Sequence, residues 1–176
     1  MADFLTDVET LRKQAREEME KGPVTAAYRA DVDRVIEVMN AALATETVCA
    51  LRYRQHHFAA TGLDAEPVAA EFLVHANEEQ EHADRLATRI AQLGGKPDLD
   101  PDTLTARSHS QYETADSLET MIRENLVAER IAIASYTEII NWLGTSDPTT
   151  RRLFEDILAV EEEHADDLIG FLDKVG

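Results

Sequence analysis

The sequence has few of the residues that interrupt helices or cross-link a chain. Its 176 residues include one cysteine, Cys49, which excludes an internal disulfide and a cysteine-rich metal knuckle. Seven glycines and five prolines leave room for long uninterrupted helices. No apolar run approaches the roughly 20 residues of a membrane span, and the first residues lack the basic and apolar regions of a secretory signal. We therefore expect a cytoplasmic protein without a membrane partner.

Positive charge is scarce as well. The chain has 35 acidic and 17 basic residues, a net charge of −18. This charge disfavours contact with the phosphates of DNA and makes metal cations natural partners. A hydrophobic content of 44% excludes a disordered chain. At this length we expect one domain with an ordinary core.

Helical periodicity dominates, and no segment shows the alternation of a strand. We expect an accessory N-terminal helix at 3–21, and we divide the chain into an accessory segment, 1–24, and a bundle, 25–176. Four bundle helices are expected, at about 28–60, 67–93, 118–143 and 149–174. The connection at 95–115 is long enough to run the length of the bundle. The sequence thus predicts an all-α four-helix bundle with one long crossover.

Two of these helices begin with capping signals. The segment Asp116-Ser117-Leu118-Glu119 resembles a capping box. Asp147-Pro148 places a capping carboxylate before a proline at the first helical position. Both signals favour helix starts close to the positions that periodicity gives.

The second and fourth bundle helices carry a repeated motif. The segments are EEQEHADRL at 78–86 and VEEEHADDL at 160–168. Their alignment pairs Glu79 with Glu161 and His82 with His164. Each glutamate lies within the apolar stripe of its helix, and the histidine three residues later points to nearly the same side.

The first and third bundle helices also match each other. Glu46 is followed seven residues later by Tyr53, and Glu129 is followed seven residues later by Tyr136. Both glutamates again fall on apolar stripes. Four glutamates and two histidines are therefore expected inside the bundle: Glu46, Glu79, His82, Glu129, Glu161 and His164.

Four buried carboxylates would repel one another and lose hydration at a cost of several kcal/mol per ion. Two metal ions, bridged by two carboxylates and each completed by one glutamate and one histidine, would neutralise them. Carboxylate and imidazole ligands suit iron or manganese, whereas zinc, a further substitute, more often recruits thiolates. These six residues are the expected catalytic metal ligands.

Several neighbouring residues allow two interpretations. Tyr53 and Tyr136 are expected either to donate hydrogen bonds to the ligands or act as radical sites, or simply to pack in the bundle. His75 is expected in the core or in support of a ligand, His56 and His57 nearer the surface, and Cys49 in the core. The remaining acids of the motif form a solvated face or a path for incoming cations: Glu78, Glu81, Glu162 and Glu163.

The paired Glu-x-x-His motif resembles the bacterioferritin type of the ferritin-like superfamily, over about residues 30–173. The resemblance implies a ferritin-like bundle that binds two irons per chain. It implies terminal or chelating roles for Glu79 and Glu161, and it leaves bridging or terminal roles open for Glu46 and Glu129. Bacterioferritins ligate haem through a Met directly after the first motif glutamate, where this chain has Gln80. No haem is therefore expected.

Residues 82–98, HADRLATRIAQLGGKPD, are similar to the Dps-type mini-ferritins. Those proteins hold iron between subunits with an Asp and a Glu four residues later. Here Asp84 matches the first ligand, but Thr88 stands at the second position. The N-terminal extension and the short stretch after His164, with no room for a fifth helix, favour a homo-oligomeric dodecamer over a 24-mer. No DNA binding is expected, because the first 22 residues mix acids and bases.

These observations predict a ferroxidase that oxidises Fe(II) with oxygen or hydrogen peroxide and stores Fe(III) mineral in an oligomeric cage, with roles in iron storage and oxidative stress. A di-metal peroxidase or a manganese catalase could use the same six ligands. A third interpretation is a metal-binding structural bundle without catalysis.

Overall fold

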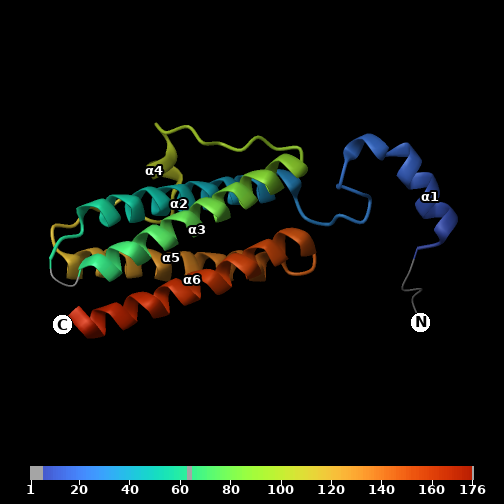
Figure 1. The fold of residues 1–176 in the computed structure, drawn as a ribbon. Helices are drawn as coiled ribbons and strands as arrows, with labels where there is room; N and C mark the ends of the chain where they lie inside the picture. The colour runs from blue at the N-terminus through green and yellow to red at the C-terminus, as the bar shows by residue number, and fades with distance from the viewer. Residues whose placement is uncertain (1–5, 63–64, 176) are drawn as a thin grey trace.

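The computed structural model describes residues 6–62 and 65–175, and every regular element in those ranges is helical. Four long helices form a bundle (Figure 1): α2 (Val32–Ala59), α3 (Ala65–Gln92), α5 (Leu118–Leu143) and α6 (Pro148–Val175). The helix α2 packs along α3, and α5 packs along α6. The expected four-helix bundle with one long crossover is confirmed.

The N-terminal segment contains a shorter helix than expected. It consists of α1 (Val8–Glu17) and a single 3-10 turn, η1 (Met19–Lys21). The N-terminal part of the expected helix, 3–5, lies outside the described residues. Neither element contains a buried residue, and α1 extends away from one end of the bundle (Figure 1). The division of the chain at residue 24 stays a prediction.

The helix α2 begins four residues later than expected. The carboxylate of Asp31 accepts a hydrogen bond from the backbone N–H of Arg34 at 3.2 Å, so Asp31 caps the helix and Val32 is its first residue. Tyr28, which was expected inside the helix, instead donates its hydroxyl hydrogen bond to Asp147 at 2.8 Å.

The cap of α6 lies where the sequence places it, whereas α5 is capped by Ser117, one residue later than the expected capping box that begins at Asp116. Ser117 accepts a hydrogen bond from the backbone N–H of Thr120 at 3.2 Å. Asp147 accepts one from the backbone N–H of Thr150 at 2.9 Å, and Pro148 is the first residue of α6.

The long crossover contains one turn of helix that the sequence did not indicate, α4 (Leu104–Arg107). Four residues are too few to show a helical period. The buried side chain of Leu104 packs with Ala44 and Val48 of α2, which fixes the crossover against the bundle.

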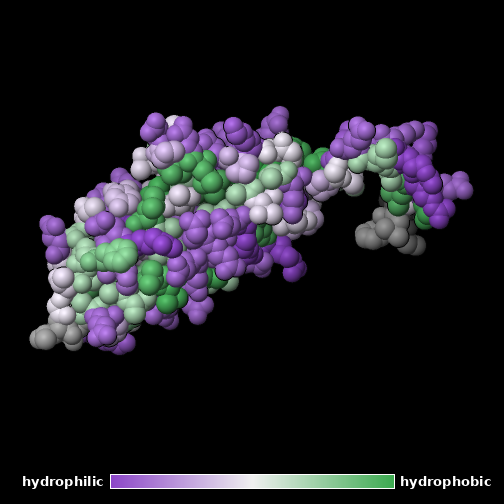
Figure 2. Space-filling view, turned by 45° about the horizontal axis from the view of Figure 1, so that its top comes forward, coloured by the Kyte–Doolittle hydropathy of each residue, from purple (hydrophilic) through white to green (hydrophobic). Residues whose placement is uncertain are grey.

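The bundle core is divided into two apolar clusters. One lies around Met39, Leu86 and Phe154, and the other around Phe72 and Ile122. A layer of buried polar residues lies between the two clusters, in the middle of the bundle. Within the described ranges, none of the helices has the length and apolar character to cross a bilayer, and hydrophilic residues cover much of the face seen in Figure 2.

Candidate di-metal centre

The polar layer consists of the six residues that the sequence singled out. Each of the four bundle helices contributes at least one glutamate, and α3 and α6 each add a histidine. No residue in this ligand cluster is more than 3% exposed. Its members are Glu46, Glu79, His82, Glu129, Glu161 and His164.

The ligand cluster divides into two overlapping groups whose ligand atoms lie within 4.8 Å of one another. The His82 half contains Glu46, Glu79, His82 and Glu161, and the His164 half contains Glu79, Glu129, Glu161 and His164. Glu79 and Glu161 are therefore common to both halves. The family resemblance implied terminal or chelating roles for these two glutamates, whereas the structure brings both of them within reach of each half.

The distances fit ligands grouped around an ion. In the His82 half, His82 Nδ1 lies 3.2 Å from Glu46 and 3.0 Å from Glu161. In the His164 half, His164 Nδ1 lies 3.6 Å from Glu79 and 3.5 Å from Glu161. Both histidines thus direct the same ring nitrogen at the shared carboxylates.

The two tyrosines link the hairpins to each other. Tyr53 of α2 donates its hydroxyl hydrogen bond to Glu129 of α5, and Tyr136 of α5 donates to Glu46 of α2. Burial and the neighbouring carboxylates raise the pKa of both tyrosines well above the usual value, so the hydroxyls stay protonated and donate. Of the two interpretations of these residues, the contacts favour hydrogen-bond donation to the ligands.

The two histidines of the cluster are basic. Burial opposes the charge of His82, but the contacts with Glu161 and Glu46 outweigh it and raise the pKa of His82 to about 10. Burial opposes the charge of His164 in the same way, but the contact with Glu161 and the charge of Glu129 raise its pKa to about 9. Without metal, both imidazoles therefore hold protons at neutral pH.

The glutamates divide into two kinds. Burial and the negative charge of Glu161 raise the pKa of Glu79 and of Glu129 well above the usual value. Burial also disfavours the charged form of Glu161, but the close contacts with the two histidines prevail and lower its pKa to about 2. The metal-free cluster thus balances its carboxylates with protons, which an incoming cation would displace.

Several buried polar atoms of the cluster lack a hydrogen-bond partner among the described residues. They include both carboxylate oxygens of Glu161, one oxygen each of Glu79 and Glu129, and Nδ1 of His164. An unpaired buried polar atom costs about 1–3 kcal/mol. Metal ions bonded to these atoms would remove that cost, so the donor set fits a pair of ions with mixed oxygen and nitrogen ligands.

Comparison with known proteins agrees with this geometry. A family model, the ferritin-like domain, matches residues 36–175. The chain belongs to the ferritin-like family. Among solved structures, this ferritin-like chain is similar to a dodecameric thioferritin, the bacterioferritin-related protein of Bacteroides fragilis, with 32% identity and a TM-score of 0.80. That match covers 93% of this chain and 94% of the other.

Two further relatives have different names. The structure of Desulfovibrio desulfuricans bacterioferritin, described with a diiron site, is similar with a TM-score of 0.72 and 26% identity, over 82% of this chain and 81% of that one. The DNA protection during starvation protein of Pyrococcus furiosus is 32% identical over 139 residues, which are 76% of this chain and 74% of that protein. The mixture of bacterioferritin and Dps features in the sequence is confirmed.

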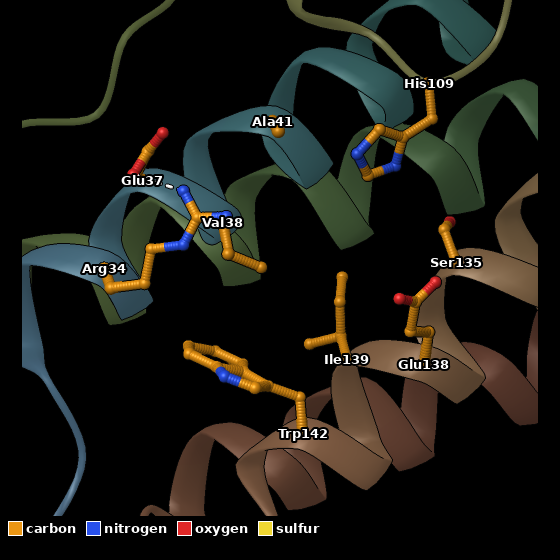
Figure 3. A pocket seen from close by; sticks show the side chains of 9 residues that line it. All are labelled: Arg34, Glu37, Val38, Ala41, His109, Ser135, Glu138, Ile139 and Trp142. Carbon is orange, nitrogen blue, oxygen red and sulfur yellow. Dashed lines mark ion pairs between the residues drawn. The ribbon is translucent and has the colours of Figure 1, made fainter.

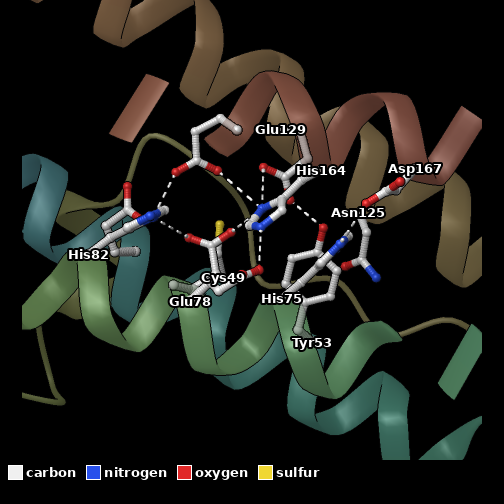
Figure 4. Close-up of polar contacts among 12 residues, drawn as sticks. Cys49, Tyr53, His75, Glu78, His82, Asn125, Glu129, His164 and Asp167 are labelled. Atoms are coloured by element: carbon white, nitrogen blue, oxygen red, sulfur yellow. Dashed lines mark hydrogen bonds and ion pairs between the residues drawn. The ribbon is translucent and has the colours of Figure 1, made fainter. Parts of the chain in front are cut away.

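Glu78 makes a contact that the sequence did not indicate. Its carboxylate lies 2.9 Å from Nε2 of His164, on the opposite side of the ring from the other ligands (Figure 4). A carboxylate in this position orients a metal-binding imidazole and increases its basicity. The repeat carries no signal for this contact, because the position that matches Glu78 in α6 is Val160.

Of the three further histidines that the sequence analysis considered, His56 departs most from its expected place. His75 is 1% exposed and stacks on His164 with ring centres 3.9 Å apart, as expected for a core or supporting residue. His56, expected nearer the surface, is fully buried and lies 3.2 Å from Asn125. His57 is partly buried, and its Nδ1 lies 2.6 Å from the carbonyl oxygen of Ala69.

Cys49 is buried, as expected. Burial raises the pKa of its thiol to about 12, so the thiol stays protonated. Arg52, which the sequence analysis did not single out, is also buried and donates to the side-chain oxygen of Asn125 at 2.9 Å and to the backbone oxygen of Gln111 at 2.9 Å.

A surface cavity lies apart from this ferritin-like centre. It has a volume of about 420 Å³ and lies between α2 and α5, with Arg34, His109 and Trp142 in its wall (Figure 3). No member of the ligand cluster lines it. The ligand cluster is therefore separate from this cavity.

Proposed function

We propose that this ferritin-like chain is a ferroxidase that oxidises Fe(II) with oxygen or hydrogen peroxide and stores the Fe(III) product inside a homo-oligomeric cage. The observation that carries the proposal is the pair of overlapping ligand groups that share Glu79 and Glu161. The similarity to a bacterioferritin described with a diiron site supports iron over manganese.

The geometry favours Glu79 and Glu161 as the bridging ligands of two ferrous ions, since each belongs to both groups. Glu46 and His82 would complete one coordination shell, and Glu129 would complete the other together with His164. The family resemblance implied terminal or chelating roles for Glu79 and Glu161 and left bridging or terminal roles open for Glu46 and Glu129, so this assignment differs from it at the first pair.

Two adjacent ferrous ions supply two electrons together, which reduce oxygen with two protons to hydrogen peroxide, or hydrogen peroxide with two protons to water. The two-electron step avoids the release of one-electron oxygen radicals. The six donors contribute a fixed array that holds the increased charge of the ferric product in a site closed to bulk water.

The surrounding residues of the chain prepare the donors. Tyr53 and Tyr136 hold the terminal carboxylates in place by donating hydrogen bonds to them. Glu78 holds the ring of His164 so that Nδ1 faces the shared carboxylates. The imidazoles must lose their protons to bind iron, so loading the site releases protons.

Storage requires a cavity that one bundle does not enclose, so the function needs a symmetric assembly. We propose a dodecamer of about 235 kDa, twelve times 19.6 kDa. The similarity to a thioferritin described as dodecameric supports this number. Some relatives are named for DNA binding, but the net charge of −18 favours a cage that acts without DNA.

The test is an anaerobic titration of metal-free protein with ferrous iron, followed by oxygen or peroxide, with ferric absorbance recorded over time. We expect saturation at two ferrous ions per chain, rapid oxidation, and continued iron uptake afterwards. A catalase would consume peroxide without accumulating iron, and a structural bundle would do neither. Oxidation no faster than in buffer would contradict the proposal.

A further inference from the structure

A second group of potential ligands lies beside the His164 half. Glu71 and His75 are one turn apart on α3, and Asp167 lies opposite them on α6. We call these three residues the outer triad. His75 Nε2 is 3.6 Å from Glu71 and 3.6 Å from Asp167, and the ligand atoms of all three lie within 4.8 Å of one another.

The outer triad spans from the protein interior to the surface. The side chain of His75 is 1% exposed, that of Glu71 34% and that of Asp167 46%. Burial and the charge of Asp167 raise the pKa of Glu71, because the two carboxylates face the same small space. A hydrated cation could therefore reach the two carboxylates from solvent and meet the imidazole behind them.

His75 provides an independent indication of a ligand. Both ring nitrogens are buried, and neither has a hydrogen-bond partner in the part of the chain that the structure describes. A buried imidazole without a partner is costly. Its Nε2 faces the two carboxylates at a distance too long for a hydrogen bond.

That same distance suits two ligands of one metal ion. Donors about 2.1 Å from an ion lie roughly 3.0–3.6 Å apart at bond angles of about 90° to 120°. The 3.6 Å separations between His75 and its two carboxylates reach the upper end of this range. One imidazole and two carboxylates also form a donor set that suits divalent iron, cobalt or manganese.

We propose that the outer triad is a third cation site, which binds one divalent ion and delivers it to the His164 half of the centre. The delivery role rests on the proposed ferroxidase function, whereas the binding role does not. The stacked ring of His164, 3.9 Å from that of His75, lies next along the path inward, and the half-exposed carboxylate of Glu78 contacts Nε2 of that ring (Figure 4).

The internal repeat supplies a natural comparison. In the alignment that pairs Glu79 with Glu161, the positions that match the outer triad in the other half are Leu153, Ile157 and Arg85. Two are apolar, and Arg85 already pairs with Asp156 at 3.1 Å. The His82 half therefore has no equivalent cation site, and the third site is confined to one half.

The binding test uses crystals of the full-length protein soaked in cobalt(II) chloride, with anomalous scattering to locate the ions. We expect a cobalt ion between Glu71, His75 and Asp167 in the wild type, and none there in Glu71→Gln/Asp167→Asn. The matched control, Glu66→Gln/Glu138→Gln, removes the same charge from exposed positions and should keep the ion.

Failures of the two proposals can be told apart in this experiment. No cobalt at the outer triad, with two ions in the ligand cluster, overturns the third site and leaves the ferroxidase proposal intact. Cobalt at the outer triad with an empty ligand cluster supports the third site and overturns the ferroxidase proposal.

The delivery role is tested by stopped-flow measurement of the rate at which cobalt(II) fills the centre, with the absorption of the bound cobalt as the signal. We expect Glu71→Gln/Asp167→Asn to fill the centre about tenfold more slowly than the wild type, with the same final occupancy at saturating cobalt. The control variant should fill at the wild-type rate. Equal filling rates in all three proteins would overturn delivery through the outer triad.

Discussion

The His82 half and the His164 half of the centre have matching ligands but different surroundings. Each half has one histidine, one glutamate that the other half lacks, and a tyrosine donor from the opposite hairpin. Outside the ligands the match ends. The ring of His164 has a carboxylate and a stacked imidazole as neighbours, Glu78 and His75.

At the matching positions in the other half, the chain has Val160 and Ile157. The repeated hairpin therefore contains the metal ligands in both halves. The polar residues beside the ligand histidine occur in the His164 half and not at the matching positions of the other. We infer that the two ions are held by equivalent donors but differ in how they arrive and how firmly their histidine is oriented.

The largest effect is expected from the residues that both halves share. Glu161→Ala should lower the ferrous oxidation rate by orders of magnitude, because each ion loses a ligand worth several kcal/mol of charge stabilisation. Glu129→Ala, which affects one half directly, should also be severely impaired but should retain the His82 half. Initial rates of ferric absorbance compare the two variants. A smaller loss of oxidation rate in Glu161→Ala than in Glu129→Ala would contradict the assignment of Glu161 as a shared ligand and Glu129 as an unshared one.

A strong pH dependence follows from the raised pKa values of the two histidines, about 10 for His82 and about 9 for His164. Below pH 9 both rings hold protons that a metal ion must displace, so affinity should rise with pH, about tenfold per pH unit for each proton displaced. Calorimetry in buffers of different ionisation enthalpy counts the released protons.

The pH dependence should end first in the His164 half, which has the lower pKa. An affinity that is constant between pH 6 and 8, with no proton release, would show that the histidines are neutral in the metal-free protein.

A selective effect is expected at Glu78, the carboxylate that only the His164 half has. Glu78→Gln should weaken the binding of one of the two ions by about 10- to 100-fold and leave the other unchanged. Glu81→Gln, three residues along the same helix and exposed, is the matched control. Equal weakening of both ions in Glu78→Gln would show that the carboxylate acts through the total charge of the site.

The smallest effect is expected at the tyrosines, which belong to the part that both halves have in common. Tyr53→Phe and Tyr136→Phe each remove one hydrogen bond to a terminal carboxylate, worth about 1.5–3 kcal/mol when it is made to a charged group. Part of this is lost in the metal-free state as well, so affinity should fall about tenfold or less. Metal titration should give similar affinities for the two variants. A large difference between their affinities would show that the two halves differ in their tyrosine hydrogen bonds as well as in their surroundings.

The sequence predicts the ligands because they lie on helices with a clear hydrophobic periodicity and because the hairpin that carries them is repeated. Glu46 and Glu129 fall on apolar stripes, and Asp147 caps α6 as its sequence indicates. The sharing of Glu79 and Glu161 could not be read in this way, because it depends on which carboxylates meet across the bundle axis.

Other features depend on pairs of residues from different helices, about which periodicity carries no information. The contact of Glu78 with His164 and the meeting of His75 with Asp167 are of this kind. The late start of α2 has a different cause, since the expected helix began at Tyr28 although Asp31 was available as a cap directly before the first residue of the apolar stripe, Val32. Burial of His56 rests on one partner, Asn125 of α5, that the sequence does not place.

The central claim is that Glu79 and Glu161 are shared by two ions while Glu129 serves one. The most direct measurement is the number of ferrous ions bound per chain in anaerobic calorimetric titrations of the wild type, Glu129→Ala and Glu79→Ala/Glu161→Ala, each first checked for helical content. The account predicts two tightly bound ions in the wild type, one in Glu129→Ala and none in the double variant. Two ions retained in the double variant, or a single ion in the wild type, would contradict it.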